Sequence, residues 1–274
     1  MGFYIDTHFH LFLDDFNLKF TPEEIIKDSL NKNVLKLWLA STNKRDILKN
    51  LNFCTKYPDN LKAWVGFHPE NVLEYDIKFL KNILKNSKYA DLIIGLGEIG
   101  IDLDDFVLEL FKKNGLSNKN LLLSQQKKAF YEQIELALDF NLPFAVHSRK
   151  AFKPTFDVLK SFTNAHFVWH CYNLNKDRTI KLLNTFKNIY FGFNSIITYK
   201  SGEYVLDSLK YIPLNRILVE TDAPFLSPRP FVYKHNTPIG VIPVYTKIAK
   251  IFNISTESLQ EIVYKNALSL SKLQ

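Results

Sequence analysis

Cysteine is scarce in this chain, with only Cys54 and Cys171 among 274 residues. The two lie far apart in the sequence and form no CxxC pair, which favours reduced thiols over a disulfide. A chain of this length buries a large core without covalent crosslinks. We therefore expect a cytoplasmic protein with free thiols.

Long apolar runs are also missing. No run approaches eighteen apolar residues, so no transmembrane helix is expected. The first residues, MGFYIDTHFH, contain no basic segment followed by an apolar stretch, so we expect no signal peptide. Asp6 stands where N-myristoylation requires Ser or Thr. These absences predict no association with membranes.

The chain lacks interdomain linkers, low-complexity segments and blocks of like charge, which predicts a single domain over residues 1–274. Its composition, 46% hydrophobic and 23% charged, is that of an ordinary globular protein. The formal net charge of +7 favours approach to polyanions such as nucleic acid. This excess is weak evidence alone, because many lysines belong to solvated helix faces. No feature predicts an obligate protein partner.

Short apolar strands alternate with amphipathic helices along the whole chain. Most of the strands are continuous apolar runs, as expected for parallel strands buried on both faces. Eight are predicted, at residues 3–10, 35–42, 63–69, 92–102, 143–149, 166–172, 189–195 and 217–225. Strict alternation of eight strands with at least eight helices predicts an α/β fold closed into a (β/α)8 TIM barrel.

Two connecting segments add detail to this prediction. The helix after the first strand has Thr21 as its N-cap, Pro22 at its first position and Glu24 three residues after the cap. Residues 102–124 form an unusually long link between the fourth strand and its helix. For this link we predict either a short helix with a loop over the barrel mouth or a surface segment without a functional role.

The predicted strand ends are rich in metal-binding side chains. Functional groups of a TIM barrel gather at the carboxyl ends of its strands. His8 and His10 share one strand face, because side chains alternate with period two. A single strand-end histidine is more often a hydrogen-bonded structural residue, but here six candidate ligands coincide. They are His8, His10, Glu98, His147, His170 and Asp222.

This ligand set suits zinc and also manganese or magnesium. Glu98 is the natural bridge between two divalent ions, because a carboxylate offers one oxygen to each. Two such ions would polarise a phosphoryl oxygen and hold a bridging hydroxide. Asp222 would orient that hydroxide and accept its proton, which makes Asp222 and Glu98 the catalytic candidates. Glu220 is expected to support a ligand or to lie in the barrel interior rather than to be a ligand.

Several motifs resemble the TatD family of metal-dependent deoxyribonucleases, in the amidohydrolase superfamily. They are DTHFH, GFHPE, GEIGID, QQKKAFYEQIELALDFNLPFAVHSRKA, WHCY and ETDAPFLSPRP, in the family's order over nearly the whole chain. The resemblance implies a TIM-barrel hydrolase with two metals that cleaves DNA phosphodiesters, commonly as a 3′→5′ exonuclease on single strands. It implies one ion on His8, His10 and Asp222, another on His147 and His170, and Glu98 shared. It also places His68 at the substrate phosphate.

Two departures from the family's usual pattern affect the expected substrate site. An aromatic residue, Ser and Gly usually follow the HC pair, where this chain has Tyr172–Asn175. A short Tyr-rich link is usual where this chain has the segment 102–124. The family's basic stretch before Asn-x-Pro is retained near Lys234 and His235. GLGEIGID contains no Lys, unlike branches of the superfamily that bridge their metals with a carbamylated lysine.

Residues after the fifth, sixth and eighth strands are candidates for contacts with nucleic acid. Positive side chains at the mouth would face phosphate oxygens, and aromatic rings would stack on bases. The candidates are Arg149, Lys150, Arg229, Lys234 and His235 for phosphates, and Tyr172 and Phe225 for bases. Cys171 is expected to alternate onto the other strand face and to pack as a thiol.

Three functions remain open at this point. The first is a DNA phosphodiesterase, with single-stranded DNA as the preferred substrate. The second keeps the same site but hydrolyses an ester or amide, for instance by removing a D-amino acid from a charged tRNA. The third is a nucleic-acid or protein partner without catalysis, which the complete set of six ligands disfavours.

Overall fold

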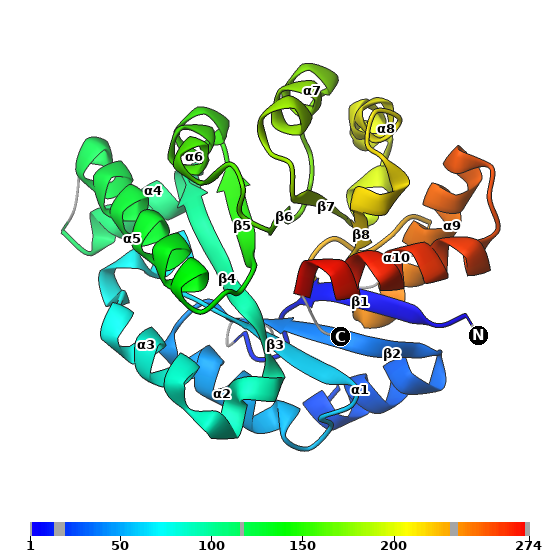
Figure 1. Cartoon of the computed structure of the whole chain (residues 1–274), viewed down its shortest axis with the longest axis horizontal. Helices are drawn as coiled ribbons and strands as arrows, with labels where there is room; N and C mark the ends of the chain where they lie inside the picture. The colour runs from blue at the N-terminus through cyan, green and yellow to red at the C-terminus, as the bar shows by residue number, and fades with distance from the viewer. Residues whose placement is uncertain (1, 14–19, 116–117, 231–234, 272–274) are drawn as a thin grey trace.

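A computed structural model describes residues 2–13, 20–115, 118–230 and 235–271. Eight parallel strands form one sheet in sequence order, and helices surround it (Figure 1). The strands are β1 (Tyr4–Phe9), β2 (Val34–Ala40), β3 (Leu61–Val65), β4 (Ile93–Asp102), β5 (Phe144–Arg149), β6 (Phe167–Trp169), β7 (Ile189–Phe193) and β8 (Ile217–Val219). The predicted TIM barrel is confirmed.

The helices lie between the strands and after the last of them. They are α1 (Pro22–Asn31), α2 (Lys44–Cys54), α3 (Ile77–Lys85), α4 (Asp105–Lys113), α5 (Lys119–Asp139), α6 (Phe152–Leu159), α7 (Lys176–Thr185), α8 (Glu203–Leu209), α9 (Val241–Phe252) and α10 (Thr256–Ser271). At α1 the predicted capping box is present: Glu24 N–H donates to Thr21 Oγ1, and Glu24 Oε2 accepts from Thr21 N–H. Among the described residues, no helix is long and apolar enough to cross a membrane.

Strands β6 and β8 end several residues before their predicted limits. Cys171 and Asp222 have left-handed backbone conformations, with φ of 47° and 57°. An extended strand cannot continue through such a residue. The chain therefore leaves the sheet directly after β6 and β8, where predicted ligands follow.

The first and last strands meet at the carboxyl end of the barrel. Asp222 N–H donates to His8 O over 2.9 Å, and His10 N–H donates to Ala223 O over 2.7 Å. The buried Asp6 carboxylate accepts hydrogen bonds from the Thr221 backbone and hydroxyl. These bonds nearly close the barrel beside two predicted ligands.

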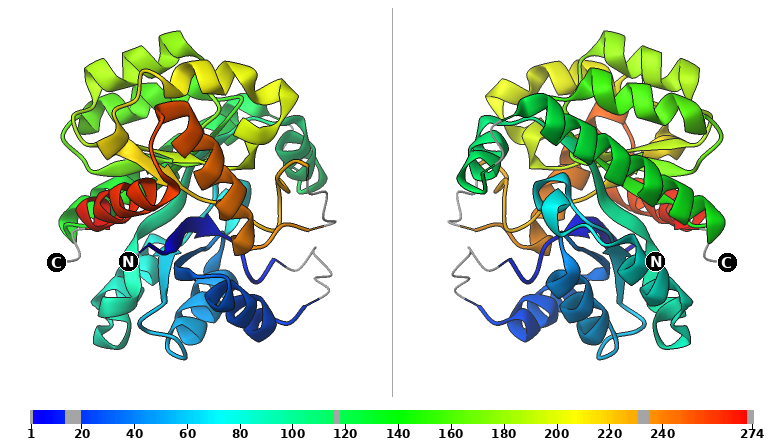
Figure 2. Two further views of the ribbon diagram at one scale, coloured as in Figure 1. Left: turned by 90° about the vertical axis from the view of Figure 1, so that its right-hand side faces the viewer. Right: turned by 90° about the vertical axis from the view of Figure 1, so that its left-hand side faces the viewer.

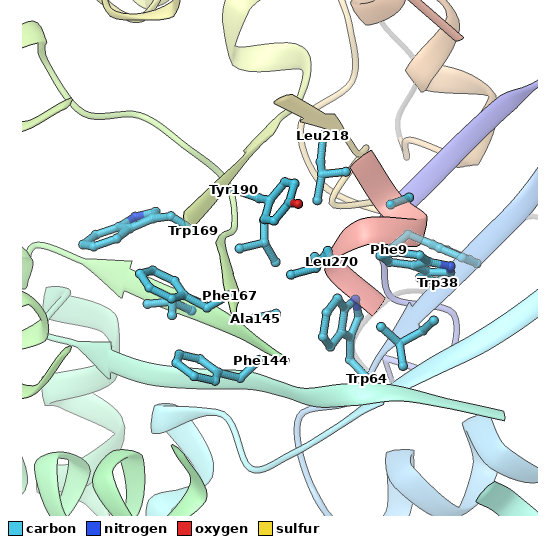
Figure 3. Packing of buried hydrophobic residues seen from close by; sticks show 14 of the residues in the cluster. Phe9, Trp38, Trp64, Phe144, Ala145, Phe167, Trp169, Tyr190, Leu218 and Leu270 are labelled. Atoms are coloured by element: carbon cyan, nitrogen blue, oxygen red, sulfur yellow. The ribbon is translucent and has the colours of Figure 1, made fainter. Parts of the chain in front are cut away.

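Large aromatic side chains fill the space inside and around the strands. The Phe144 and Phe167 rings stack with centroids 5.2 Å apart, and Trp38 and Trp64 meet edge to face at 5.6 Å. Leu270 of α10 lies among these rings (Figure 3). One hydrophobic cluster runs from the first strand to the last helix, so a rigid scaffold supports the strand ends.

The long link after β4 contains helix α4. Val107 and Phe111 on its buried face pack against Val72, Leu122 and Ala129, in a small cluster separate from the main core. Figure 2 shows α4 at the end of the barrel opposite to both chain termini. The predicted short helix is therefore present, anchored by its own apolar contacts.

Candidate metal centre

Glu98 lies at the centre of the barrel mouth and is 3% exposed. Its Oε2 lies 3.4 Å from two imidazole nitrogens, those of His8 and His10. Its Oε1 faces the other three histidines of the site, at 2.5 Å from His147 Nδ1, 3.2 Å from His170 Nε2 and 3.7 Å from His68 Nε2. The two carboxylate oxygens thus face different groups of histidines.

Asp222 completes the cluster after β8. Its Oδ1 lies 3.4 Å from His10 Nε2 and 3.8 Å from His170 Nε2. The structure therefore brings together all six residues predicted as metal ligands, and His68 joins them.

The donor set fits a divalent metal. Both ring nitrogens of His8 are buried and have no hydrogen-bond partner within the described part of the chain. A buried polar atom without a partner is costly, and a metal ion would remove that cost at one nitrogen. Imidazole nitrogens together with carboxylate oxygens suit zinc, manganese and other borderline ions.

Three carboxylates hold the cluster in place from outside. Glu220 Oε1 lies 2.9 Å from His170 Nδ1 and accepts a hydrogen bond from the Cys171 N–H. Asp102 Oδ2 lies 3.0 Å from His147 Nε2. The third, Asp6, joins β1 to the segment after β8. Glu220 has the supporting position predicted for it.

Asp102 and Asp6 were not among the candidates from the sequence. Period-two alternation gives a signal for both, since Asp102 is four residues after Glu98 on β4 and Asp6 is two residues before His8 on β1. Their contacts with other strands are what distinguish them from ordinary polar residues.

Electrostatics keep the central carboxylates ionised. Burial opposes the charge of Glu98, but the nearby His170, His147 and His68 hold its pKa well below the usual range. The pKa of Asp222 is also lowered: burial opposes this, but His170 and the hydrogen bond with His10 outweigh it. Both groups therefore offer anionic oxygens without first releasing a proton.

The histidines of the site differ in the direction in which their pKa is shifted. Burial alone would lower the pKa of His10, but hydrogen bonds to Asp222 and Glu98 outweigh it and raise that pKa to about 10. Burial and the neighbouring His147 lower the pKa of His68 to about 3. His68 is therefore neutral at pH 7 and offers a lone pair as well as a hydrogen-bond donor.

A glycine allows β4 and β5 to approach closely at the site. Gly100 has φ of 153°, and a Cβ there would lie 1.9 Å from the His147 carbonyl oxygen. Any other residue would push the strands apart. The short contact between Glu98 and His147 depends on this close approach.

A cavity of about 780 Å³ opens over the cluster, within the range of small-ligand pockets. Phe106 of α4 and Phe225 after β8 line it, and both are exposed. The lining residues include five carboxylates and one arginine, Arg149.

The predicted substrate residues differ in their positions. His68 and Arg149 line the cavity, and the Arg149 Nε lies 3.5 Å from Asp104 Oδ2. Arg229 is exposed but does not line the cavity, and its guanidinium lies over the Tyr199 ring. Lys234 lies outside the described residues, and Lys150 is paired with Asp104 and Asp105.

The prediction that Tyr172 stacks on a base is wrong. Its side chain is 1% exposed, and its ring packs edge to face against Phe191 and Phe193. Its hydroxyl lies 2.6 Å from Thr179 Oγ1. Because the chain turns directly after β6, this ring points into the protein and not into the cavity.

The position predicted for Cys171 is also wrong. The left-handed backbone at this residue breaks the strand alternation, so the thiol lines the cavity and its Sγ is grouped with ligand atoms of His170 and Asp222. The Asn194 side-chain amide donates to Sγ over 3.1 Å. Burial raises the pKa of this thiol to about 12, so it is protonated at pH 7.

Comparison with known proteins places the chain among relatives of the same length. An uncharacterized metal-dependent hydrolase of Buchnera aphidicola subsp. Baizongia pistaciae is 28% identical over 272 residues, covering 99% of this chain and 97% of that protein. The uncharacterized metal-dependent hydrolase YabD of Bacillus subtilis is 28% identical, covering 98% of both chains. The crystal structure of YJJV, a TatD homologue of Escherichia coli, superimposes with a TM-score of 0.82 at 22% identity, covering 99% of this chain and 98% of the other.

The family model of TatD related DNases matches residues 5–272. This match contains all six residues that converge on the barrel mouth. The chain therefore belongs to the TatD-related DNase family of metal-dependent hydrolases.

Proposed function

We propose that this protein hydrolyses DNA phosphodiester bonds as a 3′→5′ exonuclease on single strands, with two divalent ions. The observation that carries the proposal is the Glu98 carboxylate, whose two oxygens face two different groups of histidines. Family membership supports the same reaction. Zinc, magnesium and manganese are the candidate ions.

The ligands divide between the two ions. One ion would be held by His8, His10 and Asp222, the other by His147 and His170, with Glu98 shared. When bound, the ions supply Lewis acidity, which lowers the pKa of water and neutralises charge on a phosphoryl oxygen. They would also offset the negative charge of the cavity lining.

The protein's own side chains position the reactants. Asp222, ionised and beside His10, accepts a proton from the attacking water. His68, neutral and on the cavity wall, donates a hydrogen bond to a phosphate oxygen. Arg149 at the rim contributes the permanent positive charge among the lining residues and pairs with a neighbouring phosphate.

The direct test is incubation of the pure protein with a 3′-labelled single strand in the presence of magnesium or manganese. We expect metal-dependent loss of the 3′ label while the 5′ end of the strand is still intact. Asp222→Asn is expected to lower the rate by about 10²–10⁴-fold, because it removes a proton acceptor, while circular dichroism remains unchanged. Folded, metal-loaded protein that leaves the label intact would overturn the proposal.

The same assay separates the alternative substrate class. A charged tRNA carrying a D-amino acid is offered in parallel, since activated water also attacks a carbonyl. Release of the amino acid without cleavage of DNA would show that the site hydrolyses carboxylic esters and not phosphodiesters.

We also propose that the protein acts in the cytoplasm. Both Cys54 and Cys171 are free thiols in the structure, as is usual in a reducing compartment. Fractionation of cells with an antibody to the protein tests this location, and recovery in an extracytoplasmic fraction would contradict it.

A further inference from the structure

Helix α4 places an exposed aromatic ring at the cavity. Phe106 is 62% exposed and lines the same cavity as the metal cluster. Phe225 lines it too, with its ring centroid 6.2 Å from that of His10. These residues follow β4 and β8, which are four strands apart in an eight-stranded barrel. The two residues therefore follow strands on opposite sides of the barrel.

The position of Phe106 is fixed by its helix. Val107 and Phe111 are each 1% exposed and anchor the inner face of α4. The N-cap of the helix is Asp104, whose N–H donates to Asp102 Oδ1 over 2.8 Å. The other oxygen of Asp102 contacts His147. A chain of direct contacts thus links the start of α4 to the metal cluster.

Phe106 is exposed although the next residue, Val107, is buried. The residue is next to the anchored Val107, but it lines the cavity and does not belong to the small cluster. Pockets for organic ligands are lined largely by hydrophobic and aromatic side chains. A planar ring offers an aromatic ligand a stacking face.

The charge of the cavity points to the same kind of contact. Among the described residues that line it, Arg149 is the one lysine or arginine, against five carboxylates. Lysine and arginine side chains of the described lining therefore supply few contacts to a polyanion here. Stacking of bases on aromatic rings holds single-stranded nucleic acid independently of charge and largely independently of sequence.

We propose that α4 is a nucleobase-binding wall, in which Phe106 stacks on an unpaired base of the substrate while Phe225 faces a second base across the mouth. This inference rests on the proposed DNA substrate and adds a reason for single-strand preference. A base inside a duplex has both faces covered by its neighbours, whereas an unpaired base exposes a face to Phe106.

The test compares Phe106→Ala with Tyr204→Ala. Tyr204 is also an exposed aromatic residue, 46% exposed, but it lies on α8 outside this cavity. Binding is measured with single-stranded oligonucleotides that carry phosphorothioate linkages, in the presence of magnesium. We expect Phe106→Ala to weaken binding by about 5- to 150-fold, and Tyr204→Ala to bind as the wild type does.

Oligonucleotides that lack one base provide the specific readout. Removing the base that stacks on Phe106 is expected to weaken binding to the wild type, while Phe106→Ala binds the intact and the abasic strands equally. Fluorescence of 2-aminopurine at that position should be quenched by the wild type and recover in the variant. KM for hydrolysis should rise more than kcat falls.

The possible failures are distinguishable. If the wild type cleaves DNA but Phe106→Ala binds every strand as tightly as the wild type, the nucleobase-binding wall is wrong and the proposed function stands. If the wild type neither binds nor cleaves DNA, the proposed function is wrong, and the nucleobase-binding wall is wrong with it. Equal weakening of intact and abasic strands would show that the variant disturbs the site without loss of a stacking contact, and would overturn the inference.

Discussion

At the scale of single residues, two histidines of the candidate metal centre each contact a second carboxylate besides Glu98. Asp102 contacts His147, and Glu220 contacts His170, each at the ring nitrogen on the far side from the one that faces Glu98. Such partners fix the orientation and tautomer of a histidine and strengthen it as a metal ligand.

Asp102→Asn is therefore expected to lower metal affinity by roughly 10- to 100-fold, because an amide orients His147 less strongly than a carboxylate does. Isothermal titration with manganese or zinc measures the change. Asp105→Asn is the matched control, since Asp105 is exposed and contacts Lys150 outside the cluster. Unchanged metal affinity in Asp102→Asn would show that Asp102 does not support His147 as a metal ligand.

Tyr172→Phe tests the buried position of Tyr172. Thr179 Oγ1 donates to Asn175 O, so the Tyr172 hydroxyl donates to Thr179. Loss of this bond is expected to lower the free energy of unfolding by about 0.5–1.5 kcal/mol and to leave KM for DNA unchanged. Denaturant titration and steady-state kinetics measure the two quantities. A raised KM for DNA with an unchanged free energy of unfolding would show that Tyr172 takes part in substrate binding.

At the scale of elements, α4 stands apart because its apolar contacts form their own small cluster. Its buried residues, Val107 and Phe111, do not belong to the main core. An element held by few apolar contacts opens at lower cost than the strands of the barrel.

Phe111→Ala removes the larger of the two anchors. A buried Phe→Ala change costs about 3–5 kcal/mol, and here we expect much of this cost to fall on the local opening of α4. Hydrogen exchange should show lost protection in residues 105–113, with strand amides such as those of β4 still protected. Uniform loss of protection across the barrel would show that α4 unfolds only with the whole protein.

At the scale of the whole molecule, the candidate metal centre joins the two ends of the sheet. The candidate ligands lie on β1, β4 and β5 and in the residues after β1, β6 and β8, so bound ions would crosslink strands far apart in sequence. Binding to the native state alone stabilises it in proportion to the logarithm of ligand concentration.

Metal at about 100 times its Kd is expected to stabilise the native state by about 2.7 kcal/mol relative to protein in EDTA. This corresponds to a rise in Tm of roughly 5 °C for a protein of this size, and differential scanning calorimetry measures it. His8→Ala should lose most of the rise, because it removes a ligand whose ring nitrogens have no protein hydrogen-bond partner among the described residues. An equal rise in that variant would place the ions elsewhere.

The sequence by itself determined the alternation of strands and helices and the six ligands at the strand ends. Both follow from local patterns: apolar runs form buried parallel strands, and period-two spacing puts His8 and His10 on one face. A barrel gathers its strand ends at one mouth, so the convergence on Glu98 followed from the fold class.

Tertiary structure alone decided which neighbouring side chains enter the cavity. Cys171 lines it and Tyr172 does not, because the left-handed turn after β6 breaks the alternation from which the sequence positions were predicted. Likewise the contact of Asp102 with His147 and the place of Phe106 at the cavity depend on how β4, β5 and α4 pack together. Such contacts join residues distant in sequence, and no local periodicity encodes them.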